Sequence, residues 1–550
     1  MRLIHTNTLK LGEFVGTPEN PIPPYVILSH TWGDDEVTYR EMMQPTSTTF
    51  TKDGYVKIQQ FAAAVSLLTA SRSNAIEYVW VDTCCIDKSS SAELSEAINS
   101  MYRWYKHAKY CYVYLSDIGG FGPGSENAVL PRVQVERRNN LIREALQGCR
   151  WMTRGWTLQE LLANHEVMFF DRNWELLFRK KDWIPPLSML LGISRDVLTT
   201  CDPSLASIAQ RMSWVSQRHT TRPEDIAYCL LGIFNVSMPL LYGEGGEKAF
   251  IRLQEEIMKT SDDYSLFAWR DLDRQYASYH GLLANSPTKF IKSRNIAFVD
   301  SPEDNSPFSV TNKGLSISLS LARVERVPGL YIGLLNCRDP GPNGEPLGIF
   351  LAQLGTSQYA RVDADELWVM GGRNPPYTRY HQEPVTFRIP VQFYVRQNVR
   401  FPSNYLTSEV GGFLITEDIV NPDVFLCEAS PNVTWVSRQG FIPILASDTG
   451  KQGFICYGNR VAHTMGALVI ILTWNRQSQI FGVDFHHDHR WRSGISMLSQ
   501  LLPDYSSQTI GLPDDKFIVN FTGGHLLASV KMQLGLMDHL VVIKVSIRVR

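Results

Sequence analysis

The stretch Tyr25-Val26-Ile27-Leu28-Ser29-His30-Thr31-Trp32-Gly33-Asp34-Asp35 passes from an unbroken apolar run into a polar loop. Residues 78–81, 111–115 and 167–170 form three further runs of this kind, all short and rich in Val, Ile, Tyr or Phe. Such runs are typical of buried strands. Antiparallel strands with a solvated face would alternate apolar and polar residues, so the unbroken runs predict a parallel sheet that is covered on both faces.

Apolar residues recur at helical spacing between these predicted strands. The first set lies between the first two runs and comprises Val56, Ile58, Phe61, Ala62, Val65 and Leu68. The second set lies between the next two runs and comprises Leu94, Ala97, Ile98, Met101, Tyr102 and Tyr105. Strands that alternate with helices predict an α/β domain built on a doubly wound sheet.

A chain of 550 residues exceeds what one hydrophobic core usually serves, which predicts two or three domains. We expect the α/β domain to occupy residues 1–182 and a helical extension to occupy residues 183–264, with helices near 205–215, 223–234 and 247–258. Residues 265–550 read as a β-rich, sandwich-like region. Its clearest expected strands are residues 315–321, 330–335, 385–395, 467–474 and 539–549.

The composition restricts the partners and the compartment. Lys and Arg number 53 against 55 Asp and Glu, so the formal charge of -2 gives no electrostatic argument for nucleic acid. The start lacks the apolar core of a signal peptide, and the longest apolar run, residues 467–474, is too short to span a bilayer. Nine cysteines without a Cys-x-x-Cys spacing read as reduced thiols. We therefore expect a soluble, cytoplasmic protein.

Polar residues follow the predicted strands at the ends where an open parallel sheet holds its ligands. The first strand leads into the Ser29 to Asp35 loop, the second into Asp82-Thr83-Cys84-Cys85-Ile86-Asp87-Lys88, and the third into Ser116-Asp117. We expect these strand ends to converge on one cleft.

Trp156 and Glu160 lie one helical turn apart and share a face of a predicted helix. An aromatic plane beside a carboxylate suits cleavage of a nicotinamide N-glycosidic bond. The ring would hold the cationic heterocycle, and the carboxylate would stabilise an oxocarbenium-like ribosyl centre. The alternative is structural, with Trp156 in the core and Glu160 paired with Arg154 or another cation.

Other groups permit further interpretations. Cys84 or Cys85 with His30 would make a thiol nucleophile and its base, although buried structural cysteines are the commoner case. Three loop acids are either ligands of a divalent ion or solvated side chains, namely Asp34, Asp35 and Asp87. The run His486-His487-Asp488-His489 is either a metal site or a polar surface turn. The glycine-rich stretch at residues 243–248 fits no phosphate-binding motif, so we read it as the start of a helix.

Four ordered motifs resemble the fungal heterokaryon-incompatibility (HET) domain. They are residues 28–36, 79–87 and 112–117, and the segment Arg154-Gly155-Trp156-Thr157-Leu158-Gln159-Glu160-Leu161. Residues 220–228, 241–245 and 252–257 look like the helical segment that often follows that domain. The resemblance covers about the first half of the chain.

HET-domain proteins are associated with programmed cell death when genetically incompatible fungal cells fuse, and the domain is distantly similar to the Toll/interleukin-1 receptor (TIR) domain. Some TIR domains cleave NAD with a glutamate that follows a tryptophan by four positions, after a strand that ends in serine. The matching positions here are Glu160, Trp156 and Ser116. Many TIR domains have cysteine after that tryptophan, where this chain has Thr157, so the resemblance does not extend to activities of that thiol.

The resemblance implies a TIR-like fold and an NAD glycohydrolase that takes NAD as substrate, with no bound cofactor and no metal. Glu160 is then the expected catalytic residue, and the expected substrate-binding residues are Ser29, His30, Trp32, Asp34, Asp82, Cys84, Ser116 and Trp156. The alternative is a non-catalytic signalling module that self-associates or binds an unknown protein partner to trigger cell death.

Overall fold

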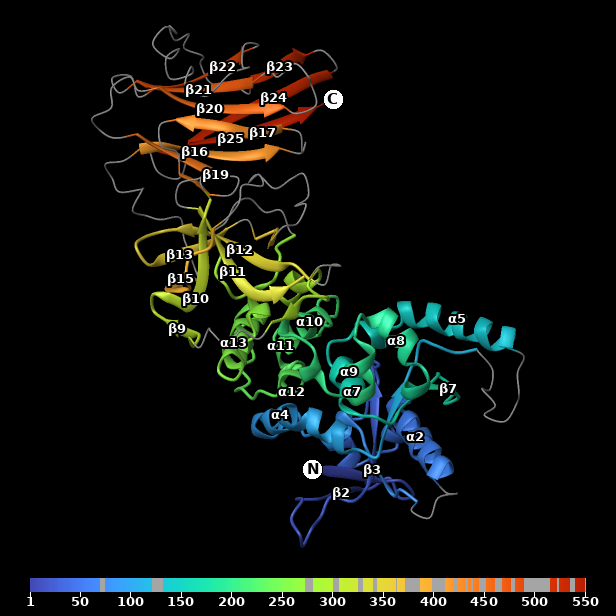
Figure 1. Ribbon diagram of the computed structural model, residues 1–550. Coiled ribbons are helices and arrows are strands. Elements are labelled where there is room, and N and C mark those ends of the chain that lie inside the picture. The colour runs from blue at the N-terminus through green and yellow to red at the C-terminus, as the bar shows by residue number, and fades with distance from the viewer. Residues whose placement is uncertain are drawn as a thin grey trace. The chain divides into compact units, whose positions relative to one another are not determined.

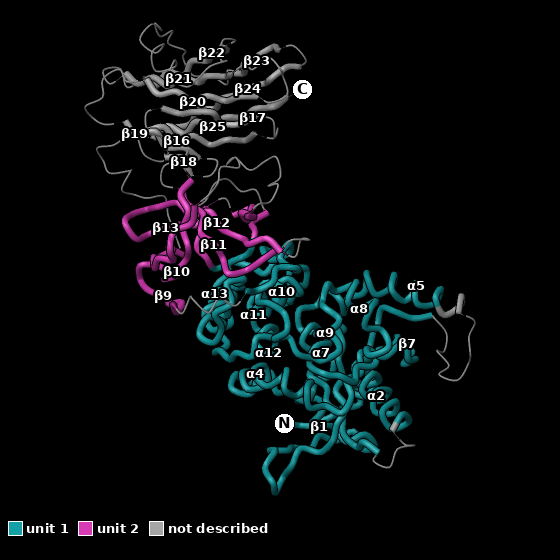
Figure 2. Tube along the Cα trace, viewed as in Figure 1, with its two compact units in different colours: residues 1–269, 283–300 teal, residues 270–282, 301–550 magenta. Residues whose placement is uncertain are grey.

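The computed structural model (Figure 1) describes residues 1–69, 75–120, 132–272, 280–299, 306–324, 330–339, 344–362, 364–370 and 386–397, and beyond residue 411 the backbone of the strands. The chain divides into two compact units, coloured separately in Figure 2. The first comprises residues 1–269 and 283–300, and the second comprises residues 270–282 and 301–550. None of the helices in these described parts is long and apolar enough to cross a membrane.

The first unit contains a seven-stranded sheet in the order β2-β1-β4-β3-β5-β6-β7. Its middle is parallel and consists of β4 (Tyr78–Trp80), β3 (Tyr25–His30), β5 (Tyr110–Tyr114) and β6 (Val167–Phe170). All six residues of β3 are buried, as are all four of β6. The four apolar runs therefore form the predicted parallel core, because only strands that are covered on both faces need to be apolar throughout.

Antiparallel strands extend this core at both edges, and the sequence pattern did not reveal them. β1 (Arg2–His5) pairs with β4 and with β2 (Leu11–Glu13), and β7 (Leu176–Arg179) pairs with β6. Each has only three or four residues and is partly exposed. Such short edge strands lack a periodic signal.

Helices connect the parallel strands as predicted. α2 (Asp53–Thr69) joins β3 to β4, and α4 (Ser91–His107) joins β4 to β5. These two connections run in opposite directions across the sheet, so right-handed crossovers place α2 and α4 on opposite faces, as Figure 1 shows. The predicted doubly wound α/β domain is therefore confirmed. The remaining helices of this part are α1 (Tyr39–Met43), η1 (Thr49–Thr51), α3 (Asp82–Cys85), α5 (Arg132–Gly148), α6 (Arg150–Thr153) and α7 (Thr157–Ala163).

The chain that follows β7 is helical, as expected, but its helices are short. The predicted helix at 223–234 is broken into α11 (Asp225–Tyr228) and α12 (Leu231–Phe234). The predicted helix at 247–258 is α13 (Gly246–Met258), and its N-cap Gly245 has a φ of 85° that only glycine adopts readily, which confirms a helix start there. The other helices are η2 (Lys180–Asp182), α8 (Ile184–Leu191), α9 (Arg195–Thr200), η3 (Pro203–Leu205), α10 (Ile208–Ser213), η4 (Tyr264–Phe267) and η5 (Pro287–Phe290). The domain boundaries at residues 182 and 264 stay predictions.

The second unit is rich in strands, as predicted. One sheet has the order β14-β12-β13-β15-β10-β11, with β9 paired to β10. Its core includes Leu330, Ile332, Phe350, Val362 and Trp368. The strands are β9 (Ser309–Thr311), β10 (Gly314–Arg323), β11 (Leu330–Arg338), β12 (Pro346–Gln353), β13 (Gln358–Val362), β14 (Trp368–Val369) and β15 (Val391–Val395), and β8 (Ala297–Phe298) precedes them in the chain.

Two further sheets are formed by the strands beyond residue 411. Their orders are β18-β19-β16-β25-β24-β23 and β17-β20-β21-β22. Of the run at 486–489, His486, His487 and Asp488 lie in β22, and His489 lies outside the described residues. The side chains of the run are not described. The strands are β16 (Gly411–Ile419), β17 (Val424–Ser430), β18 (Thr434–Val436), β19 (Gln439–Ile444), β20 (Gln452–Asn459), β21 (Ala467–Asn475), β22 (Ile480–Asp488), β23 (Asp515–Phe521), β24 (Gly524–Leu534) and β25 (Leu540–Val549).

The packing of α12 on α4 yields a stability prediction. A Cβ added at Gly232 would lie 2.1 Å from the Cβ of Tyr102, whereas a Cβ added at Gly148 would meet nothing within 4 Å. Gly232→Ala must therefore push the helices apart, and we expect it to lower the free energy of unfolding by about 1–3 kcal/mol. Gly148→Ala, at the end of α5, is the matched control and should be neutral or slightly stabilising. Urea denaturation of both variants measures the difference, and equal stabilities would refute this packing.

Candidate functional site

The candidate site lies at the carboxyl end of β3, where the strand order of the parallel core reverses. The chain leaves β3 for β4 on one side and later returns to β5 on the other side. In open α/β sheets this switch point is where ligands bind. Ser29 and His30 are the last two residues of β3, and Asp82 begins α3 directly beyond the end of β4.

Ser29 connects β3 to Glu160 on α7. The Ser29 hydroxyl donates a hydrogen bond to Oε2 of Glu160, and it accepts one from Nε1 of Trp151 at 2.7 Å. All three side chains are buried, and Glu160 is only 6% exposed. The carboxyl group that the sequence singled out therefore lies inside the protein and not on a helix surface.

Burial changes the protonation of Glu160. Desolvation raises the pKa of this carboxyl group to about 8, and the nearby charge of Asp82 acts in the same direction. Hydrogen bonds from the hydroxyls of Ser29 and Tyr105 oppose the shift. At neutral pH the group is mostly protonated. A carboxyl group with a pKa near neutrality at a sheet's switch point is a recognised mark of a functional site.

Contacts from outside the helix hold α7 at both ends. At its start, the Thr157 hydroxyl lies 2.6 Å from the carbonyl oxygen of Trp151 and accepts a hydrogen bond from Nη1 of Arg218 at 2.9 Å. At its end, Nζ of Lys180 donates to the carbonyl oxygens of Leu161 and Asn164, each at 2.9 Å. Glu160 is thus presented by a helix whose position is fixed.

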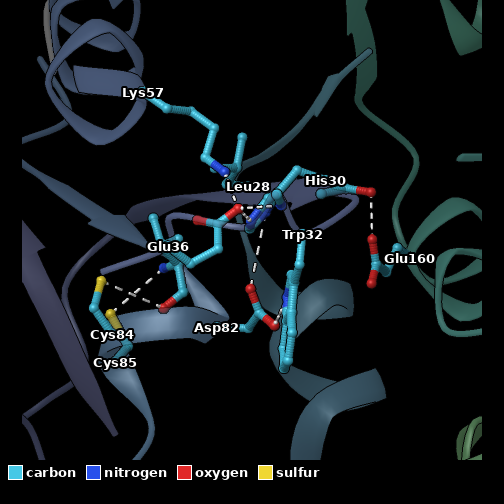
Figure 3. Close-up of polar contacts among 12 residues, drawn as sticks. Leu28, His30, Trp32, Glu36, Lys57, Asp82, Cys84, Cys85 and Glu160 are labelled. Atoms are coloured by element: carbon cyan, nitrogen blue, oxygen red, sulfur yellow. Dashed lines mark hydrogen bonds and ion pairs between the residues drawn. The ribbon is translucent and has the colours of Figure 1, made fainter. Parts of the chain in front are cut away.

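His30 lies between two carboxylates (Figure 3). Its Nε2 is 3.6 Å from Oε1 of Glu36, and its Nδ1 is 3.8 Å from Oδ1 of Asp82. Lys57 also pairs with Glu36. Although burial alone would raise the pKa of Glu36, the neighbouring His30 and Lys57 lower it to about 2. Glu36 therefore carries a negative charge beside an imidazole.

Trp32 is an exposed residue of the site. Its side chain is 42% exposed overall, and its Nε1 donates to Oδ2 of Asp82 at 2.8 Å. The ammonium group of Lys88 lies 3.6 Å from the ring centre. Arg150 donates to the carbonyl oxygen of Trp32 at 2.9 Å. The indole therefore already holds one cation over its face, which is the geometry of a cation–π contact.

The remaining predicted site residues are Trp156, Asp34, Ser116 and Cys84. Trp156 is the N-cap of α7, and its Nε1 donates at 3.3 Å to Oδ2 of Asp225 on α11, whereas Glu160 contacts β3. Asp34 and Ser116 are exposed on their loops. Cys84 is buried, and its hydrogen bond with Cys85 together with burial raises the pKa of its thiol, which disfavours the reactive thiolate. The binding roles of these residues stay predictions.

Sequence reasoning missed Trp151, Arg218 and Lys180. Trp151 and Ser29 are 122 residues apart in the chain, and the contact of Arg218 with Thr157 spans 61 residues. A local sequence pattern cannot indicate contacts between residues that lie so far apart in the chain. Metal binding receives no support from the described residues, which contain no group of three or more His, Cys, Asp or Glu side chains that could hold an ion.

The comparisons with known proteins address the same region. The family model described as heterokaryon incompatibility protein (HET) matches residues 25–160, the segment that starts with β3 and ends at Glu160. The chain therefore contains a HET domain. It is similar to vegetative incompatibility protein HET-E-1 of Podospora anserina, with 42% identity over 277 residues. The match covers 49% of this chain and 19%, or about a fifth, of that protein's length. A domain of unknown function (DUF8212) matches residues 248–318.

The raised pKa of Glu160 predicts how stability depends on pH. The group ionises at about 4.5 when unfolded and at about 8 when folded, so the folded state binds the extra proton between these values. The stabilising contribution is complete below pH 4.5 and is lost as pH rises to 8, by up to about 1.4 kcal/mol per pH unit. Glu160→Gln lacks this ionisation.

The melting temperature of Glu160→Gln relative to the unmodified protein should therefore rise from pH 4.5 to 8. Thermal melts followed by circular dichroism measure this difference. Glu166→Gln, which removes a carboxylate that is 43% exposed, is the control and should show no such trend. A pH-independent difference for Glu160→Gln would mean that the buried carboxyl group titrates normally.

Proposed function

We propose that this chain acts in heterokaryon incompatibility as a cell-death effector, and that its HET domain cleaves NAD at the nicotinamide N-glycosidic bond. The observation that carries the proposal is the buried Glu160 carboxyl group, with a pKa of about 8, at the switch point of the sheet. The HET family match over residues 25–160 and the similarity to HET-E-1 support the biological role.

Each group of the site would have its own role in cleavage of the N-glycosidic bond. The ionised form of Glu160 would stabilise the positive charge that develops on the ribosyl centre as nicotinamide leaves, and water would complete the hydrolysis. Trp32 is the exposed aromatic ring of the site and already holds the ammonium group of Lys88, so its face suits the cationic nicotinamide ring. Ser29 would keep part of Glu160 ionised through its hydrogen bond.

A second candidate is a non-catalytic module that self-associates or binds a partner to trigger cell death, with a TIR-like assembly role. The observation that favours it is the burial of Glu160, which is 6% exposed and already bonded to Ser29. A substrate would reach this carboxyl group only if the Ser29 and Trp151 contacts opened. In this alternative Glu160 contributes to the core of the domain and the surface carries the signal.

The first test is nicotinamide release from NAD by the purified full chain. We expect Glu160→Gln to lose about 100-fold or more of the rate, since it removes the group that stabilises the transition state. Glu166→Gln is the matched control and should keep the rate. Full activity in Glu160→Gln, or no release by the unmodified protein even after forced oligomerisation, would refute the enzymatic proposal.

The pH profile of the same reaction tests the ionised form. Because the carboxylate is the active form and the pKa is about 8, the rate should increase by up to about tenfold per pH unit below that value and level off above it. Ser29→Ala removes a hydrogen bond that lowers the pKa of Glu160, so the midpoint should move to higher pH. If Ser29→Ala left the midpoint unchanged, the pH profile would not reflect the ionisation of Glu160.

Cell death in a fungal host distinguishes the two candidates. If killing depends on NAD cleavage, Glu160→Gln should abolish it while the variant remains folded and expressed. Killing by Glu160→Gln at the level of the unmodified protein would favour the non-catalytic module, which should instead depend on surface substitutions that block self-association.

A further inference from the structure

Lys180 and Cys201 form a buried amine and thiol pair that the proposed function does not use. Lys180 begins η2 and is 1% exposed, and Cys201 follows α9 and is 8% exposed. Nζ of Lys180 lies 3.1 Å from Sγ of Cys201. The nitrogen and the sulfur are thus in direct contact, and no ion pair of Lys180 with a carboxylate occurs in the part of the chain that the structure describes.

The remaining contacts of Lys180 orient its nitrogen. Two hydrogen bonds lead to the carbonyl oxygens of Leu161 and Asn164, so the third direction of the nitrogen points at the sulfur. A neutral amine would keep both carbonyl contacts with its two N–H groups and turn its lone pair toward Cys201. Burial lowers the pKa of Lys180, which favours this nucleophilic form.

The backbone holds the sulfur in place. Cys201 has a φ of 56° and a ψ of 29°, the left-handed conformation, and its N–H donates to the carbonyl oxygen of Val197 as the cap of α9. A residue other than glycine, asparagine or aspartate is uncommon there. In this conformation Sγ contacts Nζ of Lys180, and the residue as a whole is 8% exposed.

We propose that Cys201 and Lys180 form an oxidative modification site, in which peroxide drives a covalent bond between the sulfur and the lysine nitrogen. Hydrogen peroxide first converts the thiol to a sulfenic acid and releases water. The lysine nitrogen then attacks that sulfur, the S–O bond breaks, and a second water leaves with the proton from nitrogen. One peroxide is consumed for each S–N bond, and a thiol reductant reverses the reaction. The site is independent of whether Glu160 cleaves NAD.

The bond would reach the candidate site through α7. After coupling, the lysine nitrogen keeps one hydrogen and can donate to only one of the two carbonyl oxygens of Leu161 and Asn164. The end of the helix that carries Glu160 thereby loses a stabilising contact. Peroxide would thus loosen the segment that holds the carboxyl group.

Peptide mapping of the full chain after treatment with hydrogen peroxide tests the proposal. Trypsin cannot cleave after a modified Lys180, so the product joins the dipeptide Lys180-Lys181 to the peptide of residues 196–211, which contains Cys201. Its mass is that of the two peptides minus two hydrogen atoms. A disulfide between the vicinal Cys84 and Cys85 would show the same loss of mass in the intact protein but in a different peptide.

We expect the joined peptide to form with peroxide, to disappear with dithiothreitol, and to be absent in Cys201→Ser and in Lys180→Arg. Cys201→Ser is nearly isosteric, so it should keep the fold. It therefore still tests the proposal if Lys180→Arg fails to fold. Hydrogen exchange of residues 157–163 should increase on oxidation of the unmodified protein and stay constant in Cys201→Ser. Oxidation of Cys201 only to sulfinic or sulfonic acid, a disulfide at Cys201, or no reaction at Cys201 would overturn the proposal.

Discussion

The burial of polar groups at the end of β3 is the constraint on which the first unit depends. Ser29 is fully buried, and the side chain of His30 is 1% exposed. A buried hydroxyl or imidazole needs partners, because its lost hydration is otherwise not replaced. Trp151 and Glu160 supply them for Ser29, and Glu36 and Asp82 approach His30. α6, α7, α3 and the loop after β3 therefore surround one strand end.

The same burial gives two carboxyl groups opposite protonation states. Glu160 meets mainly neutral hydroxyl partners, so desolvation dominates and raises its pKa to about 8. Glu36 is also desolvated, but its neighbours His30 and Lys57 lower its pKa to about 2. One strand end thus has a proton-holding acid on one side and an ionised acid on the other. Pairs of titratable groups whose environments separate their pKa values are a general feature of acid and base chemistry in proteins.

The sequence predicted what depends on local pattern and missed what depends on distant contacts. The runs that form β3, β5 and β6 were evident because strands covered on both faces must be apolar. The edge strand β7 is too short to show a period. Glu160 emerged from its spacing to Trp156, yet the two side chains have different partners, Ser29 and Asp225. Helical spacing places Cβ atoms on one face, but it does not determine which neighbour each side chain meets.

Some of the residues that hold α7 in place lie outside the segment that the HET family model matches. The matched segment ends at Glu160, but Lys180 binds the carbonyl oxygens at the end of α7, and Arg218 binds Thr157 at its start. The backbone around Gly155 also bonds to His219, through the amide of Gly155 at 2.9 Å. Residues well beyond the motif therefore determine where the carboxyl group lies. A HET segment cut at residue 160 would keep the sheet strands β3 to β5 but lose the groups that position Glu160, so the first unit, rather than the motif, is the physical unit of the site.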